Sequence, residues 1–454
     1  MSNELLKTQL DPDTIHQYDT ENVLYPWLAQ KGLNPIIVDH AKGNYFYDTS
    51  GKQYLDFTSM FVYCNLGHAD PRVIEAITQQ ANKLPTVASP FSTEVKARLA
   101  RLLAEVAPGD INKSYFCTSG AEANEGAIKL ARAATGKEKI IARYRSYHGS
   151  TYGAMSLTSD WRCWAFEPSI PGVIHCLDPY CYRCPFGATY PACDLQCAKH
   201  VEDVIRFEGS KRIAGFVAET IVGANGIIVP PDGYWQKIRE VCDKYGVLLI
   251  CDEVMTGFGR TGKWFAIEHW GVVPDVITMA KGISSGYVPL GAMSVREWVA
   301  KLFEDRPYLH GHTYSNHPLA MAAGAATIEA YKADGLIERA VEMGEYLMNK
   351  TLELSDKHPS IGDVRGKGLF VGMELVKSRK TKEPIQDPSF EGPQPLSAKM
   401  KVVAEAMKEG VYIMPGLVSV INLAPPLTIS KSDIDYAMAV LDKALMIADV
   451  EVQR

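Results

Sequence analysis

One lysine in this chain stands where its amine could bond covalently to a carbonyl group. Lys281 comes directly after the apolar segment DVITMA, which is typical of a buried strand, and directly before Gly282. A lysine at the end of a buried strand emerges into a cleft, where loss of hydration lowers the pKa of its amine and frees it to attack carbonyls. Most strand-end lysines are simply hydrated, so the position alone does not identify a site.

Asp252 is the second residue with this kind of placement. It ends the strongly apolar segment VLLIC, and a buried carboxylate needs a cationic partner. The protonated pyridine nitrogen of pyridoxal 5′-phosphate (PLP) would be such a partner, and the carboxylate would keep the ring able to accept electrons. The alternative is an aspartate that caps the turn after its strand.

A turn of small residues offers a place for a phosphate. Ser119, Gly120 and Ala121 follow the expected strand SYFCT and lead into the expected helix AEANEGAIKLARAAT. A helix start presents free N–H groups and the positive end of the helix dipole, which suits a phosphate. Tyr147 and His148 follow the segment IIARYR, where the tyrosine could stack on a flat ring. An ordinary helix start and ordinary loop packing are the alternatives.

Two further patterns point to other chemistry. Gly257, Gly259 and Gly262 match the dinucleotide pattern GxGxxG, but they lie too far from the strand that ends at Asp252, and no obvious helix follows to receive a pyrophosphate. Four cysteines have the spacing CxxC, eight residues, CxxxC, which could hold zinc through four thiolates. Local packing of an insertion is the other interpretation of these cysteines, which are Cys181, Cys184, Cys193 and Cys197.

The elements that would position these residues alternate between short apolar strands and helices. Such strands with helices between them predict an α/β fold with a mostly parallel sheet covered on both faces. A meander of strands is expected over 36–57, and a mobile loop over 378–395. Expected strands of the sheet are SYFCT, EKIIARYR, IAGFVAET, VLLICDE, DVITMAK and GAMSV, and expected helices are 71–83, 93–106, 121–135, 234–246, 337–355, 396–409 and 431–447.

We expect one large domain over 71–330 and a smaller α+β domain assembled from both chain ends, with 1–70 and 331–454 contributing to it. The length of 454 residues suits this division. A net charge of −6 gives no reason to expect nucleic acid or acidic membranes as partners. The absence of a long apolar run and of a secretion signal favours the cytoplasm, where the ten cysteines would be reduced.

Several runs together resemble the class III aminotransferases of PLP fold type I, over almost the whole chain. They include TSGAEANEGAIKLAR, YRSYHGST, VAETIVGANGIIVPPDGYW, GHTYSNHPLA and the long run from CDEVMTGFGRTG to ISSGYVPLGA. The resemblance implies a seven-stranded sheet, PLP as the cofactor, and active sites at the interface of a homodimer or homotetramer.

The resemblance also implies a role for each site residue. Lys281 would hold the cofactor covalently and shuttle the proton, and Asp252 would pair with the pyridine nitrogen. Val254 would pack behind the ring, Tyr147 would stack on its other face near His148, and Ser119, Gly120 and Ala121 would bind the phosphate. Two more residues complete the set implied for the cofactor end, namely Glu219 and, reaching the phosphate in the neighbouring subunit, Thr313.

Departures from the family concern the substrate. Relatives that act on 4-aminobutyrate or acetylornithine carry an Arg where this chain has Ser150, and Pro415 is expected where many members hold an α-carboxylate with an Arg. Neither residue can replace a bidentate Arg. The family's EPIQG becomes ETIVG, with Val222 in place of a Gln.

The segments SMFVYCNLGH, YRSYHGST and SDWRCW are most similar to the taurine–pyruvate aminotransferase branch. They imply transfer from an ω-amine such as taurine or β-alanine to a 2-oxo acid such as pyruvate. Alternative donors are 4-aminobutyrate, diamines and β-amino thioesters, and a PLP mutase, epimerase or decarboxylase of the same fold is the alternative chemistry. Arg162 is the candidate for an anion grip, with a plain surface arginine as its alternative, and Phe61 and Val62 are expected to line the pocket entrance.

Overall fold

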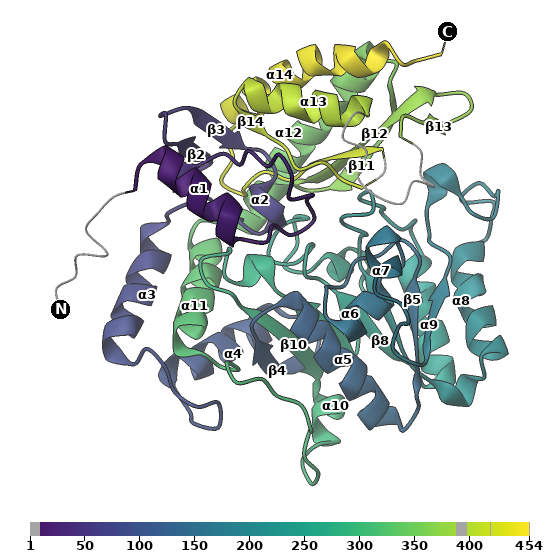
Figure 1. The fold of residues 1–454 in the computed structure, drawn as a ribbon. Coiled ribbons are helices and arrows are strands. Elements are labelled where there is room, and N and C mark those ends of the chain that lie inside the picture. The colour runs from purple at the N-terminus through teal and green to yellow at the C-terminus, as the bar shows by residue number, and fades with distance from the viewer. Residues whose placement is uncertain (1–9, 387–396, 418, 454) are drawn as a thin grey trace.

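A seven-stranded sheet forms the centre of the larger part of the molecule in this computed structural model, which describes residues 10–386, 397–417 and 419–453. Only β10 runs against the other six strands (Figure 1). The predicted α/β fold with a mostly parallel sheet is therefore confirmed. In sheet order the strands are β4 (Ile111–Cys117), β10 (Gly291–Arg296), β9 (Val276–Met279), β8 (Leu248–Asp252), β7 (Ile213–Glu219), β5 (Lys139–Arg143) and β6 (Val173–Cys176).

Both faces of this sheet are covered, as its apolar strands require. Along β8, Leu248 and Ile250 pack into one hydrophobic cluster with residues of α5, whereas Leu249 and Cys251 pack into the other. This alternation is the two-residue period of a strand buried on both sides. The helices of the larger part are α3 (Pro71–Lys83), α4 (Glu94–Val106), α5 (Gly120–Thr135), α6 (Tyr152–Leu157), α7 (Trp161–Trp164), α8 (Gln196–Phe207), α9 (Tyr234–Tyr245), α10 (Glu297–Lys301) and α11 (Pro318–Ala333).

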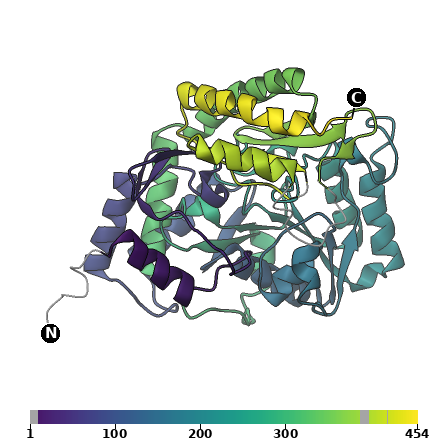
Figure 2. The same cartoon turned by 45° about the horizontal axis from the view of Figure 1, so that its top comes forward.

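N-terminal strands and C-terminal elements lie together beside the larger part. Strand β3 of the N-terminal meander pairs in parallel with β14, so the purple and yellow segments adjoin in Figures 1 and 2. The N-terminal elements are α1 (Pro12–Asn22), β1 (Val38–Lys42), β2 (Tyr45–Asp48), β3 (Gln53–Asp56) and α2 (Ser59–Val62), and the C-terminal ones are α12 (Leu336–Lys357), β11 (Ile361–Lys367), β12 (Phe370–Ser378), β13 (Glu383–Pro384), α13 (Ala398–Lys408), β14 (Val411–Tyr412), β15 (Val420–Leu423) and α14 (Lys431–Asp449).

The expected loop over 378–395 is wrong in its first part. Ser378 ends β12, and β13 turns back to pair with it, with Val376 opposite Pro384. Residues 387–396 lie outside the described ranges. The meander expected over 36–57 is present as β1, β2 and β3, whereas the boundaries at 70 and 330 stay predictions.

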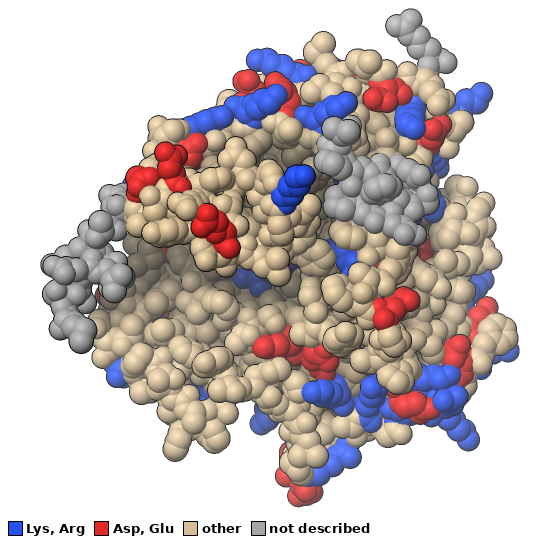
Figure 3. All heavy atoms as spheres, in the orientation of Figure 1, with Lys and Arg blue, Asp and Glu red and all other residues tan. Residues whose placement is uncertain are grey.

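On one face of the molecule, drawn in Figure 3, charged side chains are spread out rather than gathered in one patch. On the face drawn in Figure 3, Lys and Arg alternate with Asp and Glu around the edges, and the hollowed surface beneath the N-terminal elements is mostly uncharged. Within the described ranges, no helix has both the length and the apolar character needed to cross a bilayer.

Candidate active site

A cavity of about 440 Å³ opens where β7, β8 and β9 end. Ligands of open parallel sheets bind at the carboxyl ends of the strands, and this volume lies in the usual range for small-molecule sites. Every residue that the sequence assigned to the cofactor contributes to the cavity wall except Thr313. Lys281 and Asp252, which carry the prediction, therefore face the same space.

Lys281 begins a short turn of 3-10 helix directly after β9. Its backbone has a φ of 49°, a left-handed conformation that is uncommon outside glycine and is often found at active sites. Burial lowers the pKa of the Lys281 amine to about 8, although the nearby Glu219 and Asp252 carboxylates oppose this shift. The amine is thus much closer to its neutral, nucleophilic form at physiological pH than an exposed lysine.

Asp252 ends β8 and is held in a fixed orientation. Its Oδ2 accepts hydrogen bonds from Asn124 Nδ2 (2.8 Å) and His148 Nδ1 (2.7 Å), and its Oδ1 accepts one from the Val254 N–H (2.9 Å). The carboxylate is only 3% exposed. Because Oδ1 accepts a single bond, it can accept another from a cationic N–H in the cavity.

Asn124 is a site residue that sequence reasoning missed. Its amide also donates to the His148 carbonyl (2.8 Å) and accepts from Thr278 Oγ1 (2.8 Å). It lies one helical turn after the small-residue turn, so its side chain points back along α5 toward β8 and β9. A polar residue at that spacing in a helix that starts beside the strand ends was the available signal.

The small-residue turn begins α5 as predicted. Ser119 is the N-cap, and its Oγ accepts the Glu122 N–H (3.2 Å). The first N–H groups of a helix have no partner within it, so those of Gly120 and Ala121 are available to an anion. A Cβ on Gly120 would come within 2.8 Å of the Val254 side chain, so glycine is required for this close packing.

Tyr147 is positioned by Glu219. One oxygen of the buried carboxylate accepts the Tyr147 N–H (3.0 Å) and the other accepts the Gly223 N–H (2.7 Å). Burial raises the pKa of Glu219, and the negative charge of Asp252 acts in the same direction. The Tyr147 hydroxyl lies 2.9 Å from Ser150 Oγ, so the tyrosine is fixed at both ends.

Phe61 and Val62 were expected at the pocket entrance, and that expectation stays a prediction. Neither side chain belongs to the cavity wall, which instead receives Tyr63 from this segment. Phe61 is 58% exposed and Val62 is 1% exposed. Met60 and Val62 both have positive φ angles, and this irregular backbone directs the side chains differently from a regular helix or strand.

Arg162 lies beside the cavity without forming part of its wall. Its guanidinium carbon is 4.2 Å from the centre of the Tyr147 ring, and its side chain pairs with Asp160. It is 8% exposed, so the alternative of a surface arginine is wrong. Thr313 lies in an exposed turn before α11, and its predicted contact with a neighbouring subunit stays a prediction.

The structure also places the residues that stand where relatives carry a carboxylate-binding arginine. Ser150 is in the cavity wall. Pro415 forms a bridge with Ile421, and Val222 pairs with Ile228, so both contribute to local strand pairing. No arginine is part of the cavity wall in the described part of the chain.

The glycines of the GxGxxG pattern and the four cysteines of the insertion lie outside the wall of the main cavity. A Cβ on Gly259 would collide with Ile337 and Leu427, so this turn packs against the C-terminal elements. The four cysteines of the insertion line a second, small cavity. Among the residues that the structure describes, no three of their sulfur atoms lie within 4.8 Å of one another, and the zinc site stays a prediction beside local packing.

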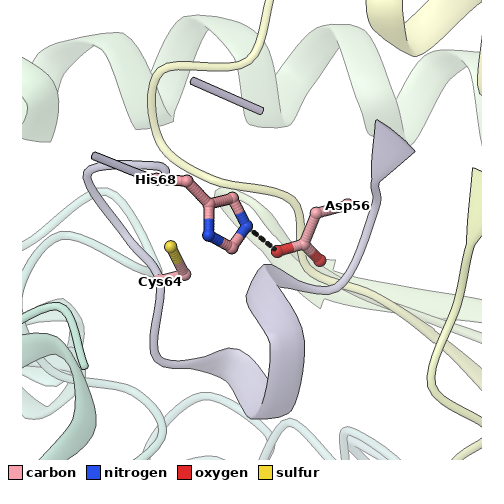
Figure 4. A group of neighbouring side chains, drawn as sticks. All are labelled: Asp56, Cys64 and His68. Atoms are coloured by element: carbon pink, nitrogen blue, oxygen red, sulfur yellow. Dashed lines mark hydrogen bonds and ion pairs between the residues drawn. The ribbon is translucent and has the colours of Figure 1, made fainter. Parts of the chain in front are cut away.

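One other group does bring three ligand types together, namely Asp56, Cys64 and His68 (Figure 4). The His68 ring lies between the other two side chains, and its Nε2 is 3.0 Å from Asp56 Oδ2. Asp56 also accepts the N–H groups of Met60 (2.8 Å) and Thr58 (3.3 Å). These bonds satisfy the carboxylate without a metal and fix the turn that presents Tyr63.

The residues present fit PLP. The cavity combines a nucleophilic amine, a buried carboxylate with a free acceptor position, a helix start for the phosphate and a tyrosine beside them. His148 Nε2 is buried without a hydrogen-bond partner within the described residues, and His148 itself lies in the cavity wall. Each part of the cofactor thus has a matching group on the protein.

Comparison with known proteins agrees with this assignment. The model of the family described as "Aminotransferase class-III" matches residues 28–445. The chain is 38% identical over 438 residues to the leucine/methionine racemase of Thermococcus litoralis, with 95% of each protein covered. It is 36% identical over 436 residues to the taurine–pyruvate aminotransferase of Rhodobacter capsulatus, covering 91% of this chain and 92% of that protein.

Among solved structures, the chain is similar to the taurine:2-oxoglutarate aminotransferase of Bifidobacterium kashiwanohense, solved in complex with PLP and glutamate. The TM-score is 0.93 at 38% sequence identity, and the match covers 98% of this chain and 100% of that one. The similarity therefore extends over both parts of the fold and is not confined to the central sheet.

Proposed function

The chain belongs to the class III aminotransferase family, and from that premise we propose that it moves the amino group of an ω-amine to a 2-oxo acid. Taurine is the leading donor and pyruvate the leading acceptor. The enzyme is a PLP-dependent transaminase. The proposal concerns the substrates, which differ widely among members of this family.

The site residues have distinct tasks in this reaction. PLP, when bound, supplies an aldehyde that bonds to amines and a ring that accepts the electrons of a broken C–H bond. Lys281 supplies the amine that is exchanged for the donor and then carries the proton on its Nζ. Asp252 keeps the ring nitrogen cationic, and Asn124 and His148 hold its carboxylate in place.

The observation that carries the substrate assignment is that, among the described residues, no arginine lines the cavity where relatives bind carboxylates, whereas Arg162 lies beside Tyr147. The wall has Ser150 instead, and the Glu219 carboxylate already accepts two backbone N–H groups. A donor with a single distant anionic group would then be gripped by Arg162. The taurine-named relatives at 36% and 38% identity support this choice.

Other donors differ from taurine in length or in their terminal group. β-Alanine has the length of taurine with a carboxylate in place of the sulfonate, and 4-aminobutyrate is longer. Diamines and β-amino thioesters lack the terminal anion, and they would leave Arg162 paired only with Asp160. A donor series therefore ranks these possibilities directly.

The assembly and location also belong to this proposal. We expect a homodimer or homotetramer in which Thr313, exposed in the single chain, reaches the phosphate in the neighbouring subunit. The partners are small amines and 2-oxo acids, without nucleic acid or membrane, and the enzyme works in the cytoplasm. Light scattering together with Thr313→Ala, which should weaken PLP retention, tests the assembly.

A racemase or epimerase is the second candidate, because the chain is 38% identical to a protein named as a leucine/methionine racemase. Lys281 and the cavity would serve that chemistry, or that of a mutase or decarboxylase, equally well. Such an enzyme would turn over one amino acid without any 2-oxo acid.

The deciding experiment mixes the purified PLP-loaded enzyme with each donor, with and without pyruvate, and measures alanine. We expect alanine from taurine and pyruvate, and none when either is left out. Racemisation of leucine or methionine in the absence of pyruvate would overturn the aminotransferase assignment in favour of the second candidate. Alanine from putrescine but not from taurine or β-alanine would overturn the anionic donor.

A further inference from the structure

The Arg162 guanidinium pairs with one carboxylate, that of Asp160. Arg162 Nε and NH2 donate to the two oxygens of Asp160, at 2.9 and 2.5 Å, which is the bidentate geometry of the strongest Arg–carboxylate pairs. The two side chains are 9% and 14% exposed. The guanidinium is thereby kept against the ring of Tyr147, and Tyr147 is part of the cavity wall.

Asp160 is itself fixed by its neighbours. It is the N-cap of α7, where its Oδ1 accepts the Arg162 N–H (3.0 Å). Its Oδ2 also accepts Asn225 Nδ2 (3.0 Å), and the same amide nitrogen donates to the carbonyl of Ser146 (2.9 Å), the residue before Tyr147. The carboxylate therefore joins the Arg162 helix to the Tyr147 loop, and it cannot move away without losing several hydrogen bonds.

This arrangement has a consequence for charged substrates. A guanidinium has five N–H donors, and Asp160 accepts the one on Nε and one of the two on NH2, so three donors, two of them on NH1, are not used by this pair. The charge of Asp160 also cancels much of the positive potential that an incoming anion would feel at short range. A buried anionic neighbour thus weakens the grip of Arg162 on anionic substrates while leaving neutral amines unaffected.

We propose that Asp160 is a specificity-determining positioning residue, which holds Arg162 on Tyr147 and sets how strongly the enzyme prefers anionic donors. The inference rests on the proposed role of Arg162 as the anion grip. Asp160 acts through Arg162 and does not itself touch the donor. With a neutral residue in place of Asp160, Arg162 stays on the Tyr147 ring but binds anions more tightly.

The test is a double-mutant cycle with Asp160→Asn and Arg162→Gln. The donor half-reaction of the PLP-loaded enzyme is followed by absorbance without any 2-oxo acid. The two donors are taurine and butylamine, whose tail carries no charge. The Oδ1 of asparagine retains the N-cap and can accept one Arg162 N–H, whereas its NH2 group accepts none. We expect Asp160→Asn to lower the half-saturating taurine concentration about tenfold, with that of butylamine changed less than about twofold.

Calorimetric binding of isethionate, the taurine analogue that has no amine, gives a readout independent of catalysis. It should tighten by the same factor in Asp160→Asn and weaken by about tenfold or more in Arg162→Gln. In the double variant, Asp160→Asn should have no effect on either probe. Asp160→Glu, which retains the charge, should restore the wild-type preference.

Asp178 offers a control, because it is a buried aspartate near the Tyr147 loop and accepts the Arg145 N–H. Asp178→Asn removes a charge without touching Arg162, and it should leave the preference between taurine and butylamine unchanged. If Asp160→Asn weakens both donors equally, or acts just as strongly without Arg162, then Asp160 has only a structural role and the inference fails. If Arg162→Gln leaves isethionate binding unchanged, the anion grip itself fails, and with it this inference.

Discussion

The cofactor end and the donor end of the cavity are built from different kinds of structure. At the cofactor end, Glu219 and Asp252 end neighbouring parallel strands and Lys281 follows the next one, and the register sets Glu219 opposite Asp252 and Asp252 opposite Thr278. At the donor end, Tyr63 and Tyr147 come from irregular segments, and Arg162 lies behind the wall on a short helix. Residues at strand ends are placed by the sheet, whereas the donor end depends on individual hydrogen bonds.

Among tests of this contrast, Lys281→Ala should have the largest effect. Without the amine, both covalent attachment and proton transfer are lost, so alanine formation should fall by about four orders of magnitude. The near-visible absorbance band of the bound cofactor should disappear as well. Lys301→Ala, which changes an exposed lysine paired with Glu297, is the control and should keep both. A Lys281→Ala enzyme that retained the band would remove the lysine from the cofactor end.

Asp252→Asn should have the next largest effect. The substitution keeps the shape of the side chain but removes the charge that holds the ring nitrogen cationic, so kcat should fall about 10²–10³-fold. PLP should still bind, because Lys281 and the start of α5 remain. Glu253→Gln is a useful comparison, because Glu253 is the next residue yet bonds to Thr220, Thr256 and two backbone N–H groups away from the cavity. A loss of stability in Glu253→Gln, with little change in the cofactor spectrum, would sharpen the contrast between the two carboxylates.

The contrast also explains what the sequence could and could not predict. Apolar runs such as VLLIC and DVITM define strands of the sheet, so the residues that follow them had to meet at one edge. Strand β6, with the pattern VIHC, was not assigned from the residues because it is short and carries a polar His175. Hydrophobic patterns also do not report positive φ angles in non-glycine residues, and Met60 and Val62 have them. Tyr63, which is in the cavity wall, was therefore missed.

A smaller change in rate, measured against pH, distinguishes Lys281 from an ordinary lysine. Burial lowers its pKa to about 8, and only the neutral amine attacks an aldehyde. The rate at which PLP reloads the cofactor-free enzyme should therefore rise almost tenfold from pH 6 to 7 and level off above about pH 8, while free Nα-acetyl-lysine keeps gaining reactivity toward about pH 10.4. Stopped-flow absorbance measures both rates. A reloading rate that kept rising through pH 10 would mean that the amine is hydrated like that of a surface lysine.

The smallest expected effect lies behind the donor end, at the contact between His68 and Asp56. His68→Ala removes one of the bonds that fix the turn before Tyr63 and leaves a buried carboxylate with fewer partners, which costs about 1–3 kcal/mol of unfolding free energy. Tyr63 packs so closely on Gly286 that a Cβ there would lie 2.3 Å from its ring, so a looser turn shifts the cavity wall. We expect the KM of the donor to rise about threefold with the cofactor spectrum unchanged, and His68→Gln, which keeps an N–H donor, to recover most of the loss. An equal decline in PLP binding would show that the two ends of the cavity are coupled, because the strand ends would then depend on the turn at Tyr63.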